Sequence, residues 1–160
     1  MSLTPEQVWQ ILDEVKDPEI PVVSVVEMGI IRQVEVQDDS VRVTMTPTFS
    51  GCPALEVMRR EIAERLSQAG VKEVDVRLAI NQPWSSDWIS PEARAKLKQF
   101  GLAPPALHHG NIDLASQEPV ACPYCGSTNT RMKNPFGSTL CRAIYYCDQC
   151  KQPFEKFKPI

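Results

Sequence analysis

The sequence lacks several features that would indicate a function directly. No apolar run approaches the roughly 18 residues that a membrane span requires, and the first five residues show no basic, apolar leader. There is no glycine-rich phosphate-binding pattern and no serine nucleophile elbow. These absences favour a cytoplasmic protein and exclude the common nucleotide-binding and serine-hydrolase motifs.

Basic charge is also scarce, with 17 Lys and Arg residues against 20 Asp and Glu residues and a net charge of -3. The distribution is uneven, because residues 122–160 carry +4 while residues 1–121 carry -7. Nucleic-acid binding usually requires a dense basic stripe, which this acidic body does not provide. A zinc-ribbon protein that binds nucleic acid is therefore an alternative that the composition disfavours.

Cysteine, by contrast, occurs six times, and four of the six form two Cys-x-x-Cys pairs. Cys122 and Cys125 form the first pair, and Cys147 and Cys150 form the second. Two sulfurs on a tight knuckle can share one metal ion at about 2.3 Å, and two knuckles complete the closed tetrahedral site of structural zinc. We predict a zinc ribbon; an iron–sulfur cluster on the same four thiolates is the alternative.

The segment around the second pair contains a fifth thiol, Cys141. It lies six residues before Cys147, so a regular strand would turn both side chains to the same face. Cys141 is either a buried small apolar residue or an additional thiol able to exchange into the metal site. Residues 139–146 and 153–157 are expected to form strands of this module.

The remaining cysteine, Cys52, stands between a predicted strand and a predicted helix. Apolar and polar residues alternate over residues 41–46, and apolar residues recur at helical spacing over residues 55–66. Pro53 fits the first helical position, and the free N–H groups and dipole of the helix favour a thiolate at Cys52. We expect a reactive or metal-ligating sulfur; a cysteine packed under the helix is the alternative.

The other periodic segments complete an α+β fold. A helix capped by Thr4 is expected to stop at Asp17-Pro18. Residues 30–37 pair with the strand over residues 41–46 as a hairpin, and residues 74–80 form a third strand. The predicted order is α-β-β-α-β, a three-stranded sheet packed with helices, followed by a C-terminal β module.

This pattern predicts two domains and a connection. A short helix capped by Ser90 ends the first domain, which covers residues 1–102. Residues 103–121 contain Pro104-Pro105 and little periodicity, so they are interpreted as a linker. The zinc ribbon then covers residues 122–160.

Aromatic and histidine residues gather near this connection. Trp84 and Trp88 form either a surface that binds a partner or a loop that folds back on its own sheet. His108 and His109 are expected to stay solvated in the linker and receive no role. Because the sequence has no other histidine, no general base is apparent for Cys52.

Five segments of the chain form a recognisable set: Asp17-Pro18-Glu19-Ile20-Pro21, Val26-Glu27-Met28-Gly29-Ile30-Ile31, Thr46-Pro47-Thr48, Gly51-Cys52-Pro53 and Phe136-Gly137-Ser138-Thr139. Together they resemble the PaaD family, accessory proteins encoded with the phenylacetyl-CoA epoxidase of phenylacetate degradation. The first part is also similar to SufT and the eukaryotic cytosolic iron–sulfur assembly factors. The resemblance extends over nearly the whole chain.

The resemblance implies a site and a role. Cys52 would hold iron or an iron–sulfur cluster transiently, with Asp17 and Glu19 in the same functional patch; from the residues alone, these two carboxylates are equally turn formers. The implied role is a non-catalytic maturation factor for the iron–sulfur or di-iron centre of the oxygenase system, whose oxygenase and reductase subunits would be its partners. One cysteine cannot supply a cluster's four thiolates, so a homodimer, the carboxylates or a partner must complete the ligands. An enzyme that attacks a thioester through Cys52 is the alternative.

Overall fold

The computed structural model describes residues 2–48, 52–79 and 81–160, which fall into two compact units. The N-terminal unit is Met1–Trp84 and the C-terminal unit is Ser85–Ile160. The expected linker, residues 103–121, lies within the C-terminal unit. It contributes to a strand at Leu102–Ala103 and forms a helix at Ile112–Gln117. No helix in the described ranges is both long enough and apolar enough to cross a bilayer.

The first helix, α1 (Pro5–Leu12), begins as predicted. The Thr4 hydroxyl accepts a hydrogen bond from the Gln7 backbone, and the Gln7 side chain accepts one from the Thr4 backbone, which completes a capping box. The helix ends at Leu12, earlier than expected. The chain turns after this residue. The Val15 N–H donates to the Leu12 carbonyl, and the Val15 carbonyl accepts a hydrogen bond from the Val25 N–H at 2.9 Å.

The sheet of the N-terminal unit has the predicted α-β-β-α-β order. Strands β1 (Ile31–Gln37) and β2 (Ser40–Met45) form an antiparallel hairpin, and β3 (Glu73–Leu78) lies parallel to β2 on its other side. A parallel pair requires a crossover connection, which helix α2 (Ala54–Gln68) provides. Ile80, the last residue of the expected third strand, lies outside the described residues.

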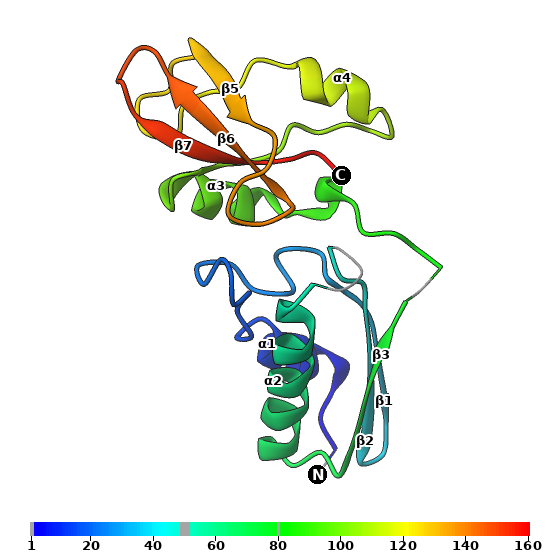
Figure 1. The fold of residues 1–160 in the computed structure, drawn as a ribbon. Coiled ribbons are helices and arrows are strands. Elements are labelled where there is room, and N and C mark those ends of the chain that lie inside the picture. The colour runs from blue at the N-terminus through cyan, green and yellow to red at the C-terminus, as the bar shows by residue number, and fades with distance from the viewer. Residues whose placement is uncertain (1, 49–51, 80) are drawn as a thin grey trace. The chain divides into compact units, whose positions relative to one another are not determined.

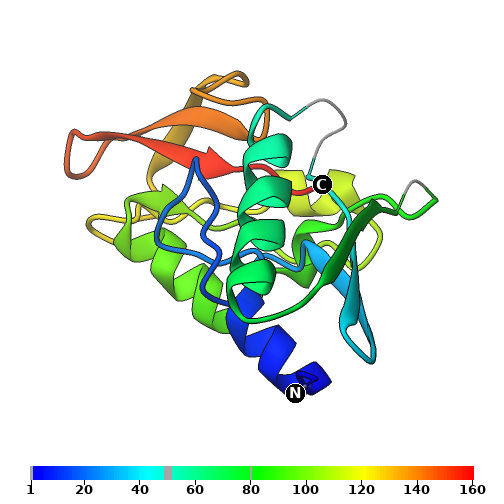
Figure 2. The same ribbon diagram turned by 90° about the horizontal axis from the view of Figure 1, so that it is seen from below.

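Helix α2 carries much of the core of this unit. Its apolar residues recur every three or four positions and are buried, namely Leu55, Met58, Ile62 and Leu66. Figures 1 and 2 show α1 and α2 on the same face of the sheet. The alternate β2 residues Val41, Val43 and Met45 are also buried. After α2 the chain reverses at Gly70, whose φ of 100° suits a glycine at a helix end.

The C-terminal unit is a four-stranded sheet with short helices. Its strands follow the order β4-β7-β6-β5, with β6 antiparallel to both β5 and β7 and β4 parallel to β7. Its elements are η1 (Ser86–Trp88), α3 (Pro91–Gln99), β4 (Leu102–Ala103), α4 (Ile112–Gln117), β5 (Thr130–Asn134), β6 (Arg142–Cys147) and β7 (Pro153–Phe157). The strand over residues 153–157 and the Ser90 cap of α3 agree with expectation, whereas β6 begins three residues later than predicted.

Candidate metal centres

The two Cys-x-x-Cys pairs lie on two turns with the same backbone hydrogen bonds. In the first, the Cys122 N–H donates to the Ser127 carbonyl and the Gly126 N–H donates to the Cys122 carbonyl, both at 2.9 Å. In the second, the Cys147 N–H donates to the Gln152 carbonyl and the Lys151 N–H donates to the Cys147 carbonyl, also at 2.9 Å. Gly126 and Lys151 both have positive φ, 78° and 62°. The turns therefore present their sulfurs in the same way.

These turns bring four sulfurs together. The Sγ atoms of Cys122, Cys125, Cys147 and Cys150 all lie within 4.8 Å of one another. The Cys122–Cys150 distance is 3.7 Å and the Cys125–Cys147 distance is 3.6 Å. Sulfurs bound at about 2.3 Å to one tetrahedral ion lie roughly 3.8 Å apart. The group is arranged to bind a single metal ion such as zinc.

Backbone N–H groups also point at these sulfurs. Tyr124 donates to the Cys122 sulfur at 3.4 Å, and Cys150 donates to the Cys147 sulfur at 3.5 Å. The Cys150 N–H lowers the pKa of Cys147 to about 7, whereas burial raises the pKa of Cys150. A bound cation stabilises all four thiolates together, which these N–H groups alone do not.

Cys52 lies at the entrance of α2, where its carbonyl accepts a hydrogen bond from the Leu55 N–H at 3.1 Å. Pro53 is the N-cap residue, and the helix begins one residue later than expected. The predicted preference for a thiolate is not observed, because burial raises the pKa of the half-buried Cys52 thiol. N–H groups of Ala54 and Leu55 lower this pKa, but they do not outweigh the burial.

The acidic loop acts on the same thiol. The charges of Glu19 and Asp17 raise the pKa of Cys52 further, so the fold brings these carboxylates near the sulfur. Asp17 is buried, and its Oδ1 accepts the Glu19 N–H at 2.8 Å, while its own N–H donates to the Val23 carbonyl. The Asp17 side chain and backbone therefore hold this loop. Among the described residues, only the four C-terminal cysteines bring three or more candidate metal ligands close together, so Cys52 and the two carboxylates do not form such a group by themselves. Ser50 and Gly51, which precede Cys52, lie outside the described residues.

Comparison with known proteins covers both units. The family described as "Iron-sulfur cluster assembly protein" matches residues 5–78, and the "PaaD zinc beta ribbon domain" matches residues 108–158. A protein of Escherichia coli (strain K12), provisionally named as a subunit of 1,2-phenylacetyl-CoA epoxidase, is 39% identical over 154 residues. The alignment covers 96% of this chain and 92% of that protein. The chain belongs to the PaaD family.

Other relatives of this PaaD-family chain match its N-terminal part. An "Fe-S protein maturation auxiliary factor" of Porphyromonas gingivalis is 38% identical over 96 residues, which are 59% of this chain and 90% of that protein. The crystal structure of a domain of unknown function (DUF59) from Bacillus anthracis is 30% identical, with a TM-score of 0.53. It covers 57% of this chain and 89% of that domain. The N-terminal fold therefore occurs without the ribbon.

The structure places the remaining candidate residues of this PaaD-family chain elsewhere. Cys141 is buried, its sulfur lies 3.0 Å from the Thr139 hydroxyl, and it is not part of the four-sulfur group. Trp84 is buried and donates from Nε1 to the Met28 carbonyl at 2.9 Å, as expected of a loop that folds back. Trp88 is half-buried in η1.

The two histidines differ from each other. His108 was expected to stay solvated, but its side chain is 9% exposed and lies 3.0 Å from the Ser85 hydroxyl, with Asp87 nearby. Asp87 accepts hydrogen bonds from the backbone N–H groups of His108 and His109. His109 itself is exposed. The His108 Nδ1 also accepts the Gly110 N–H at 2.9 Å in the turn before α4, a contact that the sequence pattern did not indicate.

One residue of the recognised motifs gained significance only from the structure. Thr46 is 2% exposed, and its hydroxyl has no hydrogen-bond partner among the described residues. Its N–H donates to the Ile30 carbonyl at 2.8 Å at the end of β2. A buried hydroxyl without a partner is unfavourable. The sequence does not indicate this burial, because Thr46 simply follows an alternating strand.

Proposed function

We propose that this protein is an accessory factor that delivers or maintains an iron-containing centre, with Cys52 as the residue that holds the cargo. The single observation that carries the proposal is that the negative charges of Asp17 and Glu19 act on the half-buried Cys52 thiol. It occurs in the part of the chain that matches an iron–sulfur assembly family. Sulfur and carboxylate oxygen are both ligands for iron.

The incompleteness of this site supports transfer rather than storage. A cluster is normally held by four thiolates, and the C-terminal cysteines are grouped into a site of their own. Cys52 must therefore share its cargo with Asp17 and Glu19, with a second copy of the chain, or with the recipient. A site that lacks ligands releases its cargo readily to a protein that offers them.

The raised pKa of Cys52 is consistent with a cargo ligand and opposes the thioester-attacking enzyme. A nucleophilic cysteine requires a thiolate near neutral pH and usually an adjacent base, whereas burial and two carboxylates keep this thiol protonated. A metal cation reverses that preference because it binds the thiolate directly. Asp17 and Glu19 then help to neutralise the charge of the cation, whereas without a cation they disfavour the Cys52 thiolate.

The recipient is inferred from the relative that spans both units. That protein is named as a subunit of phenylacetyl-CoA epoxidase, so we infer that the recipient is the iron–sulfur centre of the reductase or the di-iron site of the oxygenase in such a system. The oxygenase and reductase subunits are the proposed partners. In this proposal the four-cysteine site holds structural zinc, because its close sulfurs suit one ion.

The proposal is tested by metal and sulfide analysis of anaerobically purified protein. Wild type, Cys52→Ser and Cys141→Ser are compared, the last as a buried cysteine outside the metal group. We expect about one zinc ion per chain in all three, and labile iron only in the two proteins that retain Cys52. Cys52→Ser should also fail to activate the oxygenase. Full activation and unchanged iron in Cys52→Ser would contradict the proposal.

A further inference from the structure

Lys156, in strand β7, is a buried lysine without a polar partner among the described residues. It is 4% exposed, and within the described ranges its side chain makes no hydrogen bond or ion pair. Its Nζ lies 5.7 Å from the centroid of the Tyr145 ring, a weak cation–π contact. Burial lowers the pKa of Lys156, while the charge of Glu118 raises it. The Nζ atom is not among the fully buried polar atoms that lack a partner, so the ammonium group reaches the surface of a cavity, where an anion could pair with it.

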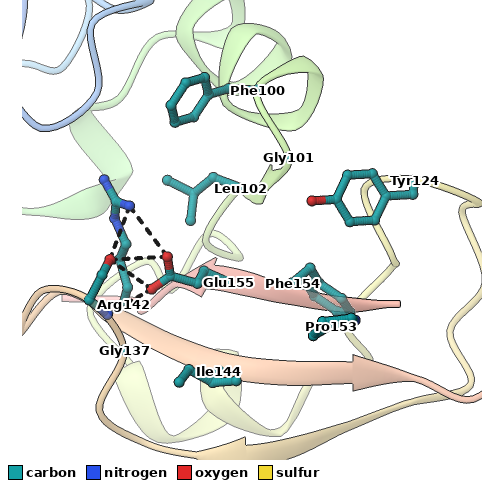
Figure 3. A pocket seen from close by; sticks show the side chains of 11 residues that line it. Phe100, Gly101, Leu102, Tyr124, Gly137, Arg142, Ile144, Pro153, Phe154 and Glu155 are labelled. Carbon is teal, nitrogen blue, oxygen red and sulfur yellow. Dashed lines mark hydrogen bonds and ion pairs between the residues drawn. The ribbon is translucent and has the colours of Figure 1, made fainter. Parts of the chain in front are cut away.

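A second buried cation in the same unit shows the difference. Arg142 is 8% exposed and lines an open groove of about 640 Å³ together with Phe100, Tyr124 and Glu155. Its Nη1 lies 3.3 Å from the Ser138 hydroxyl and 3.5 Å from a Glu155 oxygen. Figure 3 shows Arg142 and Glu155 next to each other in the groove. The protein itself supplies the counter-charge of Arg142. Among the described residues it places no comparable group against Lys156.

Lys156 opens onto a separate cavity of about 300 Å³. Most of its lining is apolar, and Pro104, Pro119 and Pro123 contribute three of the lining residues. The other charged residues at the cavity are Lys98 and Glu118, both exposed. The cavity thus combines one buried cation with apolar walls and is at the small end of the size range of ligand pockets.

The lining indicates which anion fits. Two lysines and one glutamate give the cavity a net charge of +1, which matches a singly charged anion. The three prolines have no N–H to donate, and no arginine is among the described residues that line the cavity, so it lacks the several donors that a phosphate usually binds. We propose that this cavity binds the carboxylate of a small organic acid, with Lys156 as the ion-pair partner and the proline walls against the apolar body.

The test uses the full, zinc-loaded chain and titrates benzoate, followed by isothermal calorimetry and by amide chemical shifts. Benzamide, which has the same shape without the charge, is the ligand control. Lys156→Met should weaken benzoate binding by about tenfold or more, since a charged hydrogen bond is lost. Lys133→Met, which changes an exposed lysine that is neither in the cavity lining nor in a metal-binding turn, should bind as wild type does. Lys156→Met removes an unpaired buried charge, so its Tm should be at or above that of wild type. Such a Tm would show that the variant keeps the fold.

A second variant and further ligands complete the test. Ala106→Phe fills the cavity but keeps Lys156, and it should also abolish binding. A short peptide with a free C-terminal carboxylate, compared with its amide, separates two sources: tighter binding of the free peptide identifies a partner's chain end, and tighter binding of benzoate identifies a free acid. Equal benzoate binding by Lys156→Met, equal binding of benzamide, or tighter binding of inorganic phosphate would overturn the proposal.

Discussion

The hydrophobic cores of the two units are built from different kinds of residues. The N-terminal unit packs two helices on a sheet, and its core consists of aliphatic and methionine side chains such as Leu12, Met45 and Ile62. In the C-terminal unit the buried cluster includes two metal-ligating cysteines, Cys122 and Cys147, beside Tyr145 and Phe154. Apolar packing can complete the first core, whereas we expect the second to require a metal, because two of its buried residues are metal-ligand candidates.

The thiols of the two units also differ, in the number of metal ligands that the chain supplies beside them. Four cysteines of the C-terminal unit supply a full set of ligands to one metal ion, so this site is complete within the chain. Cys52 is acted on by the charges of two carboxylates, and its unit contains no other cysteine. A complete site favours permanent binding and an incomplete one favours exchange. In the proposed function, this difference separates a structural metal from a transferable one.

Removal of zinc tests this comparison with the largest expected effect. Structural zinc contributes about 10–16 kcal/mol in zinc-finger peptides, which exceeds the stability of most small domains. Chelation under reducing conditions should therefore abolish hydrogen-exchange protection in β5, β6 and β7 and leave that of α2 and β2 intact. Zinc should restore it. Protection that persists in the chelated C-terminal unit would show that its core closes without metal.

A core deletion in α2 probes the other unit. Ile62 is fully buried, so Ile62→Ala should lower the free energy of unfolding of the N-terminal unit by about 2–5 kcal/mol. Val57, in the same helix, is 43% exposed, and Val57→Ala should change it by about 0.5 kcal/mol or less. Denaturant-dependent hydrogen exchange measures both effects, and zinc content should stay unchanged. Loss of zinc from Ile62→Ala would mean that the two units do not fold independently.

The sequence predicted those parts of the fold that depend on local pattern. The hairpin, α2 and the four-cysteine group follow from alternation, helical spacing and Cys-x-x-Cys pairs. Strand β5 was missed because its residues, Thr130–Asn134, are almost all exposed and show no apolar alternation. The expected linker was misleading for a similar reason: β4 is two residues long and is defined only by its pairing with β7.

The candidate sites divide in the same way. The metal ligands could be identified because their spacing alone specifies the chemistry. The pKa of Cys52 could not, since it depends on burial and on Asp17 and Glu19, which lie more than 30 positions away in the sequence. Lys156 gave no signal either, because a lysine within Pro153–Phe157 looks like the polar side of an ordinary strand. Tertiary burial decides both cases.

The smallest expected effect concerns the acidic loop. A cysteine is neutral when protonated, so a raised pKa means less thiolate at about pH 7.5 and slower alkylation of Cys52 than of a free cysteine. Burial is the main cause, and Glu19→Gln removes only the next contribution that raises this pKa. The pKa should fall, and alkylation by iodoacetamide at about pH 7.5 should become a few-fold faster, as measured by mass spectrometry of the Cys52 peptide.

The control for this prediction is Glu14→Gln, which removes an exposed carboxylate that pairs with Arg65. It changes the net charge of the chain by the same amount, so it should leave the rate at Cys52 unchanged. At pH values above the pKa the thiol is fully ionised in every variant, and the difference between Glu19→Gln and wild type should disappear. If Glu19→Gln alkylates at the wild-type rate at about pH 7.5 as well, the carboxylate does not act on the sulfur. Glu19 would then have no part in the exchangeable site, which would have to draw its other ligands from Asp17 or from outside the chain.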